Sequence, residues 1–171
     1  MDIKRILVPY DFSRCSAVAL DYAAQLAEPG TRLYIIHVDE LLDARISAFP
    51  KANGRFPHNS SWDRRRKKVM HHLRKVVPRT AVAVYEHHCL IGFPADEILL
   101  FAERICADLI VMGSHGRTGF SRLLMGSVAE RVMRKASSPV LVIKPPHALN
   151  VDEVAKLPKT ATLPVGDDFV I

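Results

Sequence analysis

Short unbroken apolar runs alternate with helical stretches along most of this 171-residue chain. The runs at residues 6–8, 33–36 and 109–112 show no regular alternation of apolar and polar positions, which indicates strands buried on both faces. Doubly buried strands separated by helices form a parallel sheet with helices on both sides. We therefore expect an α/β fold with an open parallel sheet covered on both faces.

Five strands and four helices are expected in alternating order. The strands are expected at residues 3–8, 33–38, 81–85, 108–112 and 139–143. The helices are expected at residues 17–27, 62–77, 95–106 and 128–135, and Pro94 suits the first turn of the third helix. The long connection at residues 39–61 is expected to include a short helix near residues 41–46. Because prolines interrupt the pattern after Lys144, we expect a domain at residues 1–144 and an extended or surface-packed tail at residues 145–171.

The composition is that of a globular protein, with 49% hydrophobic and 25% charged residues. No apolar run approaches the roughly 20 residues that cross a bilayer, and the first residues lack a signal-peptide pattern. We expect a cytoplasmic protein with no membrane insertion. The three cysteines, Cys15, Cys89 and Cys106, are too widely spaced for a zinc site or a disulfide framework, and we expect small buried or half-buried thiols.

A glycine-bearing segment links the fourth expected strand to the fourth expected helix. Gly113, Gly116 and Gly126 lie in it, and Ser127 stands at the expected start of the helix. Glycines let backbone N–H groups approach a phosphate, and a helix start adds unpaired N–H donors and the positive end of the dipole. The spacing matches neither the P-loop nor the dinucleotide fingerprint. It predicts a phosphate-binding loop of another kind, unless the glycines serve only a turn.

The loops after the first, second and fourth strands would meet if the first and fourth strands are neighbours, since ligands bind where the strand order of an open sheet reverses. Asp11, in the first of these loops, could accept hydrogen bonds from a ribose or a base. It could equally cap the first helix. The backbone near Val38 could contact a base edge.

The chain resembles the ATP-binding branch of the universal stress protein family. The resemblance runs in family order over residues 3–144. Its segments are Ile6 to Ser13, Ile36 to Val38, Gly92 to Pro94, Ala107 to Gly116, Gly126 to Ala129 and Ser138 to Ile143. The resemblance implies a Rossmann-like fold of the adenine nucleotide alpha hydrolase-like type, with five parallel strands in the order 3-2-1-4-5.

The resemblance also implies a site for ATP or another adenine nucleotide, with Mg²⁺ on the phosphates. The glycines and Ser127 would hold the phosphates, while Asp11 and Val38 would face the adenosine. Tyr10 stands where a smaller residue often precedes the aspartate, which would narrow the ribose pocket. The expected binding residues are Pro9, Tyr10, Asp11, Val38, Met112, Gly113, His115, Gly116, Arg117, Gly126, Ser127 and Val128. No catalytic or metal-ligating side chain is expected.

The resemblance further implies a homodimer whose fifth strands, Val140 to Ile143, pair across a two-fold axis. The expected function is that of a nucleotide-responsive regulatory dimer in the stress response, acting on an unidentified partner protein. Two alternatives remain. One is a slow ATPase or phosphotransferase that uses His115 or Asp11 at the same site, and the other is an interaction module that binds no nucleotide.

The run of charges at residues 63–68, with three arginines and two lysines, is the candidate for nucleic-acid binding. No aromatic residue other than Trp62 lies among these charges, so we expect a solvated helix face and no nucleic-acid partner. The pairs His71–His72 and His87–His88 do not have chelating spacing, because adjacent residues diverge on a helix and face opposite sides of a strand.

Overall fold

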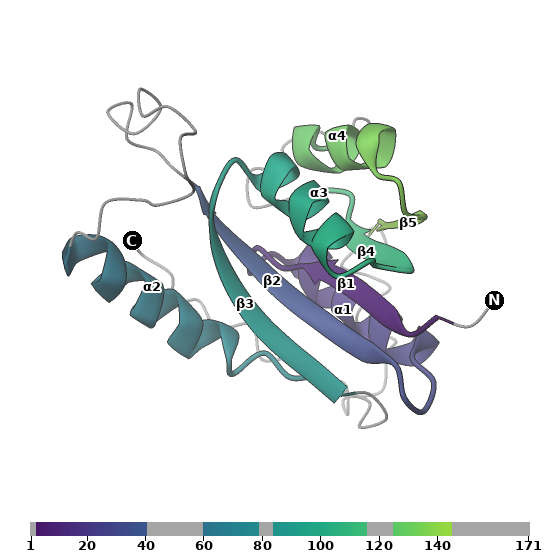
Figure 1. Cartoon of the computed structure of the whole chain (residues 1–171), viewed down its shortest axis with the longest axis horizontal. Helices are drawn as coiled ribbons and strands as arrows, with labels where there is room; N and C mark the ends of the chain where they lie inside the picture. The colour runs from purple at the N-terminus through teal and green to yellow at the C-terminus, as the bar shows by residue number, and fades with distance from the viewer. Residues whose placement is uncertain (1–2, 41–59, 79–83, 116–124, 145–171) are drawn as a thin grey trace, which may run out of the picture.

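The computed structural model describes residues 3–40, 60–78, 84–115 and 125–144. Within them, five parallel strands form one sheet in the order β3-β2-β1-β4-β5, as expected (Figure 1). The strands are β1 (Arg5–Pro9), β2 (Arg32–Glu40), β3 (Val84–Gly92), β4 (Leu109–Gly113) and β5 (Val140–Ile143). The helices are α1 (Arg14–Leu26), α2 (Ser60–Leu73), α3 (Pro94–Arg104) and α4 (Ser127–Lys135). The short helix expected near residues 41–46 and the expected tail at residues 145–171 lie outside the described residues.

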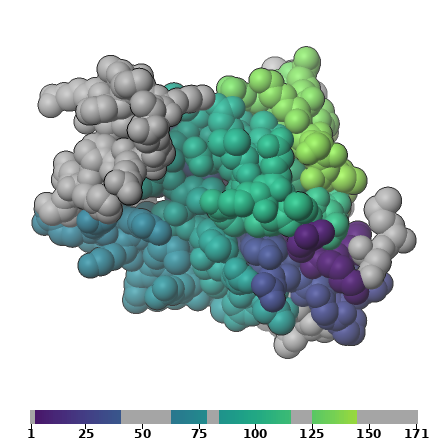
Figure 2. All heavy atoms as spheres, in the orientation of Figure 1, coloured from purple at the N-terminus to yellow at the C-terminus, as the bar shows by residue number. Residues whose placement is uncertain are grey.

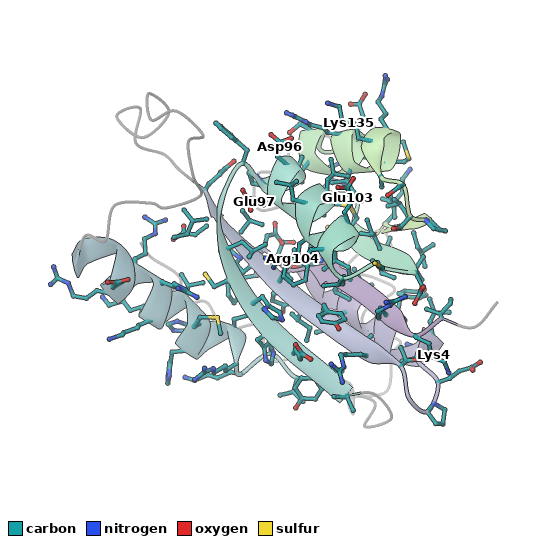
Figure 3. All side chains as sticks on the ribbon, in the orientation of Figure 1. Lys4, Asp96, Glu97, Glu103, Arg104 and Lys135 are labelled. Carbon is teal, nitrogen blue, oxygen red and sulfur yellow. The ribbon has the colours of Figure 1, made fainter. Side chains whose placement is uncertain are left out.

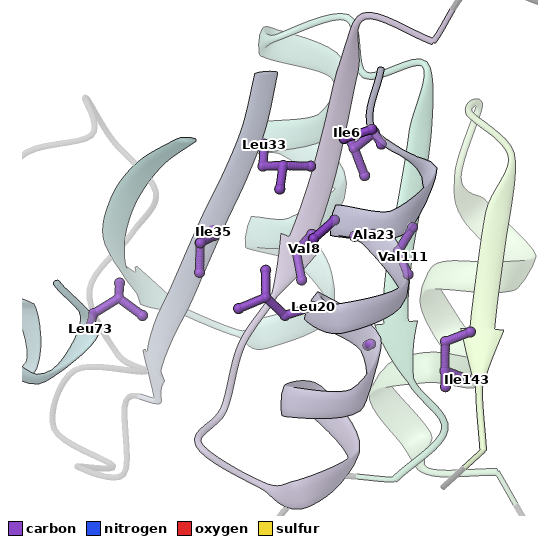
Figure 4. Close-up of a cluster of buried hydrophobic side chains, with 12 residues drawn as sticks. Ile6, Val8, Leu20, Ala23, Leu33, Ile35, Leu73, Val111 and Ile143 are labelled. Atoms are coloured by element: carbon purple, nitrogen blue, oxygen red, sulfur yellow. The ribbon is translucent and has the colours of Figure 1, made fainter. Parts of the chain in front are cut away.

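The sheet separates two apolar cores. Alternate residues of a strand point to opposite faces, so Ile6 and Val8 of β1 pack with α1, whereas Leu7 packs with α3 and α4. The α1 side also receives Leu73 of α2, which is fully buried and lies on the same side of the sheet as Ile35 (Figure 4). Both faces of the central strands are therefore covered, which is why their sequences are continuously apolar.

The third strand is the element that the sequence misplaces. It was expected at residues 81–85, but the structure has it at Val84–Gly92, nine residues long. It is an edge strand, and its first two residues, Val84 and Tyr85, are exposed. The polar residues at positions 86–88 are tolerated inside β3 because an edge strand can expose them to solvent. The apolar run at residues 81–85 ends before these polar residues, so the expected strand ended there.

Asp108, at the start of β4, holds β4 beside β1. Its Oδ2 accepts hydrogen bonds from the backbone N–H groups of Arg5 (2.8 Å) and Lys4 (3.0 Å). Burial acts to raise the pKa of Asp108, but these hydrogen bonds and the charge of Arg5 outweigh burial and hold the pKa below its usual value. The carboxylate thus fixes the register of the two strands between which the candidate site opens.

Two further expectations can be compared with the structure. The cysteines were expected to be buried or half-buried, and this is wrong for Cys106, which is exposed in a turn after α3 where its φ is +46°. Cys89 is buried, and burial followed by the charge of Asp39 raises its pKa to about 11. In the part of the chain that the structure describes, no helix has the length and apolar character to span a membrane.

Candidate functional site

A cavity of about 250 Å³ opens at the carboxyl ends of β1, β2 and β4. Strand β1 pairs with β2 on one side and with β4 on the other, so the cavity lies where the strand order reverses. Ten of the twelve residues expected from the sequence line it: Pro9, Tyr10, Asp11, Val38, Met112, Gly113, His115, Gly126, Ser127 and Val128. The other two, Gly116 and Arg117, lie outside the described residues.

The sequence missed one wall of the cavity. Pro94 and Ile98, on the first turns of α3, line it together with Ile36 of β2. Ile36 could have been found, because it lies two residues before Val38 and so shares its face of the strand. The helix residues carry no such signal, since their place depends on how α3 packs on the sheet. Together with Val38 and Met112 they make part of the lining apolar.

The loop after β1 begins α1 with a side-chain cap. Ser13 is the N-cap residue, and its Oγ accepts a hydrogen bond from the N–H of Ser16 (3.2 Å). Asp11 supports this cap, because its Oδ1 accepts the N–H of Ser13 (3.1 Å). Asp11 is therefore not itself the cap, and it also lines the cavity.

Strand β2 holds the same loop from the other side. The N–H of Tyr10 donates to the carbonyl of Ile36 (2.7 Å), and Nδ1 of His37 donates to the carbonyl of Tyr10 (2.8 Å). Phe12 adopts a left-handed conformation, with φ +64°, and its ring centroid lies 4.9 Å from that of His37. Burial, with smaller contributions from Asp11 and Asp21, raises the pKa of the Tyr10 phenol above its usual value. The residues at this end of the cavity are thus held by hydrogen bonds and ring packing.

Gly113, at the end of β4, permits a close approach between the sheet and α1. A Cβ at this position would lie 2.7 Å from Cβ of Cys15 and 2.9 Å from its carbonyl carbon. Real Cβ atoms almost never come this close to other atoms. The glycine is therefore needed for packing, whatever it does toward a ligand. The sequence predicted only the second role.

Backbone hydrogen bonds tie the start of α4 to the ends of β4 and β5. The N–H of Ser114 donates to the carbonyl of Ile143, and the N–H of Gly126 donates to the carbonyl of Ser114, both at 2.8 Å. Gly126 is the N-cap residue, and as a glycine it supplies no side-chain cap to the helix. The first residues of α4, from Gly126 to Ala129, line the cavity. An uncapped helix start at a cavity wall offers N–H donors and the positive end of a dipole to an anion.

The lining of the cavity differs in chemistry on the two sides of β1. Ile36, Val38 and Glu40 come from β2, whereas Gly113 and His115 come from the end of β4 and the start of α4 follows them. The Oγ of Ser114 and Nδ1 of His115 are 2.9 Å apart, so the imidazole has a partner in its own loop. Among the described residues, no three His, Cys, Asp or Glu side chains are grouped as metal ligands.

An ion pair joins the two helices that cover this side of the sheet. Nη2 of Arg131 on α4 lies 2.6 Å from Oδ1 of Asp96 on α3, and Asp96 stands near the top of α3 in Figure 3. Both side chains are partly exposed, so the pair contributes little to stability. The pair does link α3, which supplies apolar lining residues, to α4, whose first turn also lines the cavity.

Comparison with known proteins assigns a family to this arrangement. The model of the universal stress protein family matches residues 2–144. The chain is 36% identical over 151 residues to universal stress protein MJ0531 of Methanocaldococcus jannaschii, covering 84% of this chain and 83% of that protein. It is 30% identical over 154 residues to universal stress protein MJ0577 of the same organism, covering 82% of this chain and 94% of that protein.

Solved structures share the fold. The structure of MJ0577 matches with a TM-score of 0.62 at 28% identity, and the match covers 86% of this chain and 100% of that chain. A universal stress protein solved in complex with cAMP matches with a TM-score of 0.52 at 23% identity, covering 84% of this chain and 98% of that chain.

Proposed function

The chain belongs to the universal stress protein family, and on this premise we propose that it binds ATP or another adenine nucleotide in the cavity at the carboxyl edge of the sheet. The observation that carries the proposal is the polarity of the cavity, which is apolar at one end and has a helix start at the other. An adenine nucleotide is arranged in the same way, with an apolar base at one end and charged phosphates at the other. The complex of a universal stress protein with cAMP supports this class of ligand.

The apolar end suits the adenine ring. Val38 of β2 and Pro94 of α3 are half-buried and line the cavity, and apolar side chains beside a flat ring take its surface out of water. The carboxylate of Asp11 accepts hydrogen bonds from the ribose hydroxyls. Its place is set by the N–H of Ser13, so the acceptor is held before the ligand arrives.

The phosphates occupy the opposite end. Backbone N–H groups in the first turn of α4 donate to phosphate oxygens, and the Ser127 hydroxyl adds a donor. Gly116 and Arg117 stay predicted members of this end. Mg²⁺ would be held by the phosphate oxygens, where it offsets their charge. Because the ligand bridges the loops after β1, β2 and β4, its binding favours one arrangement of these loops, and a regulatory partner protein can read that arrangement.

Thermal unfolding tests the binding. A ligand at about 100 times its Kd stabilises a protein by about 2.7 kcal/mol, so about 5 mM Mg-ATP should raise the Tm by several degrees. The variant Gly126→Asp should lose this shift, because its carboxylate repels the phosphates. The variant should still fold, since Gly126 has φ −63° and ψ 145°, and Asp is a favoured N-cap residue.

The matched control is Gly126→Asn, which has nearly the same shape and caps equally well but carries no charge. It should keep more of the ATP-induced shift than the aspartate variant. If the wild-type protein shows no shift at this concentration, the proposed function fails. If Gly126→Asp keeps the full shift, ATP binds elsewhere on the chain.

We also propose that the regulatory form is a homodimer paired through β5. This strand is at the edge of the sheet, and its residues Val140, Leu141 and Val142 are half-buried in the single chain. An unpaired apolar edge is an aggregation hazard that a second copy would remove. Val142→Lys should therefore yield a monomer in size-exclusion chromatography with light scattering. The same change at the opposite edge, Val84→Lys, should leave the dimer intact, and a dimeric Val142→Lys protein would place the interface elsewhere.

A further inference from the structure

A stripe of basic residues runs along the outer side of α2. Leu73 is fully buried and marks the inner side of the helix. At 3.6 residues per turn, six exposed residues fall within about 120° on the opposite side. They are Arg64, Lys67, Lys68, His71, Arg74 and Lys75. The last two lie in a turn that continues the helix, because the N–H of Arg74 donates to the carbonyl of Met70 (3.0 Å).

The stripe is nearly all of one sign. The acidic residue of α2 is Asp63, at the start of the helix. Arg65 turns away from the stripe and pairs with Asp39 of β2. Figure 3 shows nitrogen-tipped side chains projecting from α2 away from the sheet, and Figure 2 shows this helix at the rim of the molecule. A hollow beside the stripe is lined by Arg66, Lys67, Met70, His71 and Arg74, together with Asp63. Cations therefore border both the outer side of the helix and this hollow.

Strand β3 brings aromatic rings to the end of α2. Nε2 of His87 donates to the carbonyl of Val76, just after α2 (2.8 Å). The ring of Tyr85, which is 40% exposed, packs edge-on against that of His87 with centroids 5.5 Å apart. His72, exposed on α2, adds another ring. Residues 85 and 87 are distant from the basic run in sequence, which is why the sequence alone predicted a solvated face with no aromatic residue other than Trp62 among the charges.

We propose that the stripe on α2 and the rings of Tyr85 and His87 form a binding surface for single-stranded nucleic acid. Between Arg64 and Lys75 the stripe is about 16 Å long, which is enough for a short run of phosphates. Cations that follow the backbone and aromatic rings that stack on bases are the two parts of such a site. A duplex is a poorer fit because its bases are already stacked. An anionic membrane is a poorer fit because the apolar side of α2 is buried in the core.

Fluorescence anisotropy with a labelled single-stranded RNA of roughly 20 nucleotides tests this surface between about 50 and about 200 mM KCl. Affinity should fall steeply with salt. The double variant Lys67→Gln/Lys68→Gln should reduce the slope of log K against log[salt] by about 1.4, because each single-strand phosphate contact contributes about 0.7. Tyr85→Ser should weaken binding by roughly fivefold or more and leave the slope unchanged, since it removes stacking and no charge.

The matched control is Arg134→Gln/Lys135→Gln, which removes the same charge from α4 and should bind RNA like the wild type. The proposal would be overturned by no binding at the lowest salt or by equal losses in the α2 and α4 variants. It would also be overturned if heparin bound as tightly as RNA and Tyr85→Ser had no effect, which would indicate attraction to any polyanion. Tighter binding to phosphatidylserine vesicles than to RNA would also overturn it. The assay contains no ATP, so its outcome is independent of the nucleotide site.

Discussion

Replacing Arg65 with methionine is expected to lower the free energy of unfolding by about 3 kcal/mol, because it leaves a buried carboxylate without its partner. The Asp39 side chain is only 7% exposed. Its two oxygens accept from Nε and Nη2 of Arg65 at 2.6 Å and 2.7 Å, which is the forked geometry that only arginine provides. The arginine itself is half exposed, so the expected loss is at the low end of the range for buried pairs. Urea denaturation measures it.

Arg66→Met is the control for this change. It removes the same charge one residue further along α2, from a side chain that is also exposed, and should alter stability by less than about 0.5 kcal/mol. Arg65→Lys should lose an amount of unfolding free energy between those of Arg65→Met and Arg66→Met, since an ammonium group keeps the charge but cannot donate two forked hydrogen bonds. The double variant Asp39→Asn/Arg65→Met should lose less than the sum of the single changes. If Arg65→Met costs no more than Arg66→Met, the pair does not hold α2 to the sheet.

The same pair bears on the proposed nucleotide site. Asp39 comes directly after Val38, whose position on β2 forms the wall of the cavity. Loss of the pair frees the end of β2 from α2. We therefore expect Arg65→Met to reduce the ATP-induced rise in Tm, although Arg65 does not line the cavity.

The central strands could be predicted from the sequence because burial on both faces leaves an unmistakable apolar run, as in Ile6 to Val8. The order of the strands was implied by the resemblance, and it is confirmed. The edge strand could not be located as well. Residues such as Glu86 and His88 are tolerated in β3 because one side of it has no neighbouring strand in the described sheet. An edge strand gives a weaker sequence signal than a central one.

For the candidate site, the residues at the strand ends could be predicted from the sequence, whereas those placed by helix packing could not. Asp11 and Val38 could be expected near Gly113 because parallel strands end at one edge of the sheet. The place of Ile98 in the cavity lining depends on how α3 packs against β2, and many side chains together determine that packing. The approach of His87 to the end of α2 is of the same kind, since nothing local relates an edge strand to the preceding helix.

Replacing Gly113 with valine is expected to destabilise the protein by about 3 kcal/mol and to lower the Tm by roughly 6 to 12 °C. The cause is steric, since Gly113 is not among the described residues with positive φ and valine is favoured in strands. An added Cβ would already lie 2.7 Å from the Cys15 side chain and 2.9 Å from its backbone. Thermal unfolding measures the loss, and Gly113→Ala should show a smaller one.

A double-mutant cycle with Cys15→Gly separates the two contacts. Removing the Cys15 side chain relieves the 2.7 Å contact but leaves the carbonyl carbon at 2.9 Å, so Gly113→Ala/Cys15→Gly should recover only part of the loss. Full recovery would mean that the backbone of α1 can move away from β4. No destabilisation in Gly113→Ala would mean that α1 is not held against Gly113. The glycine would then be free to serve the ligand alone, whereas a large loss means that the packing of α1 against β4 requires it.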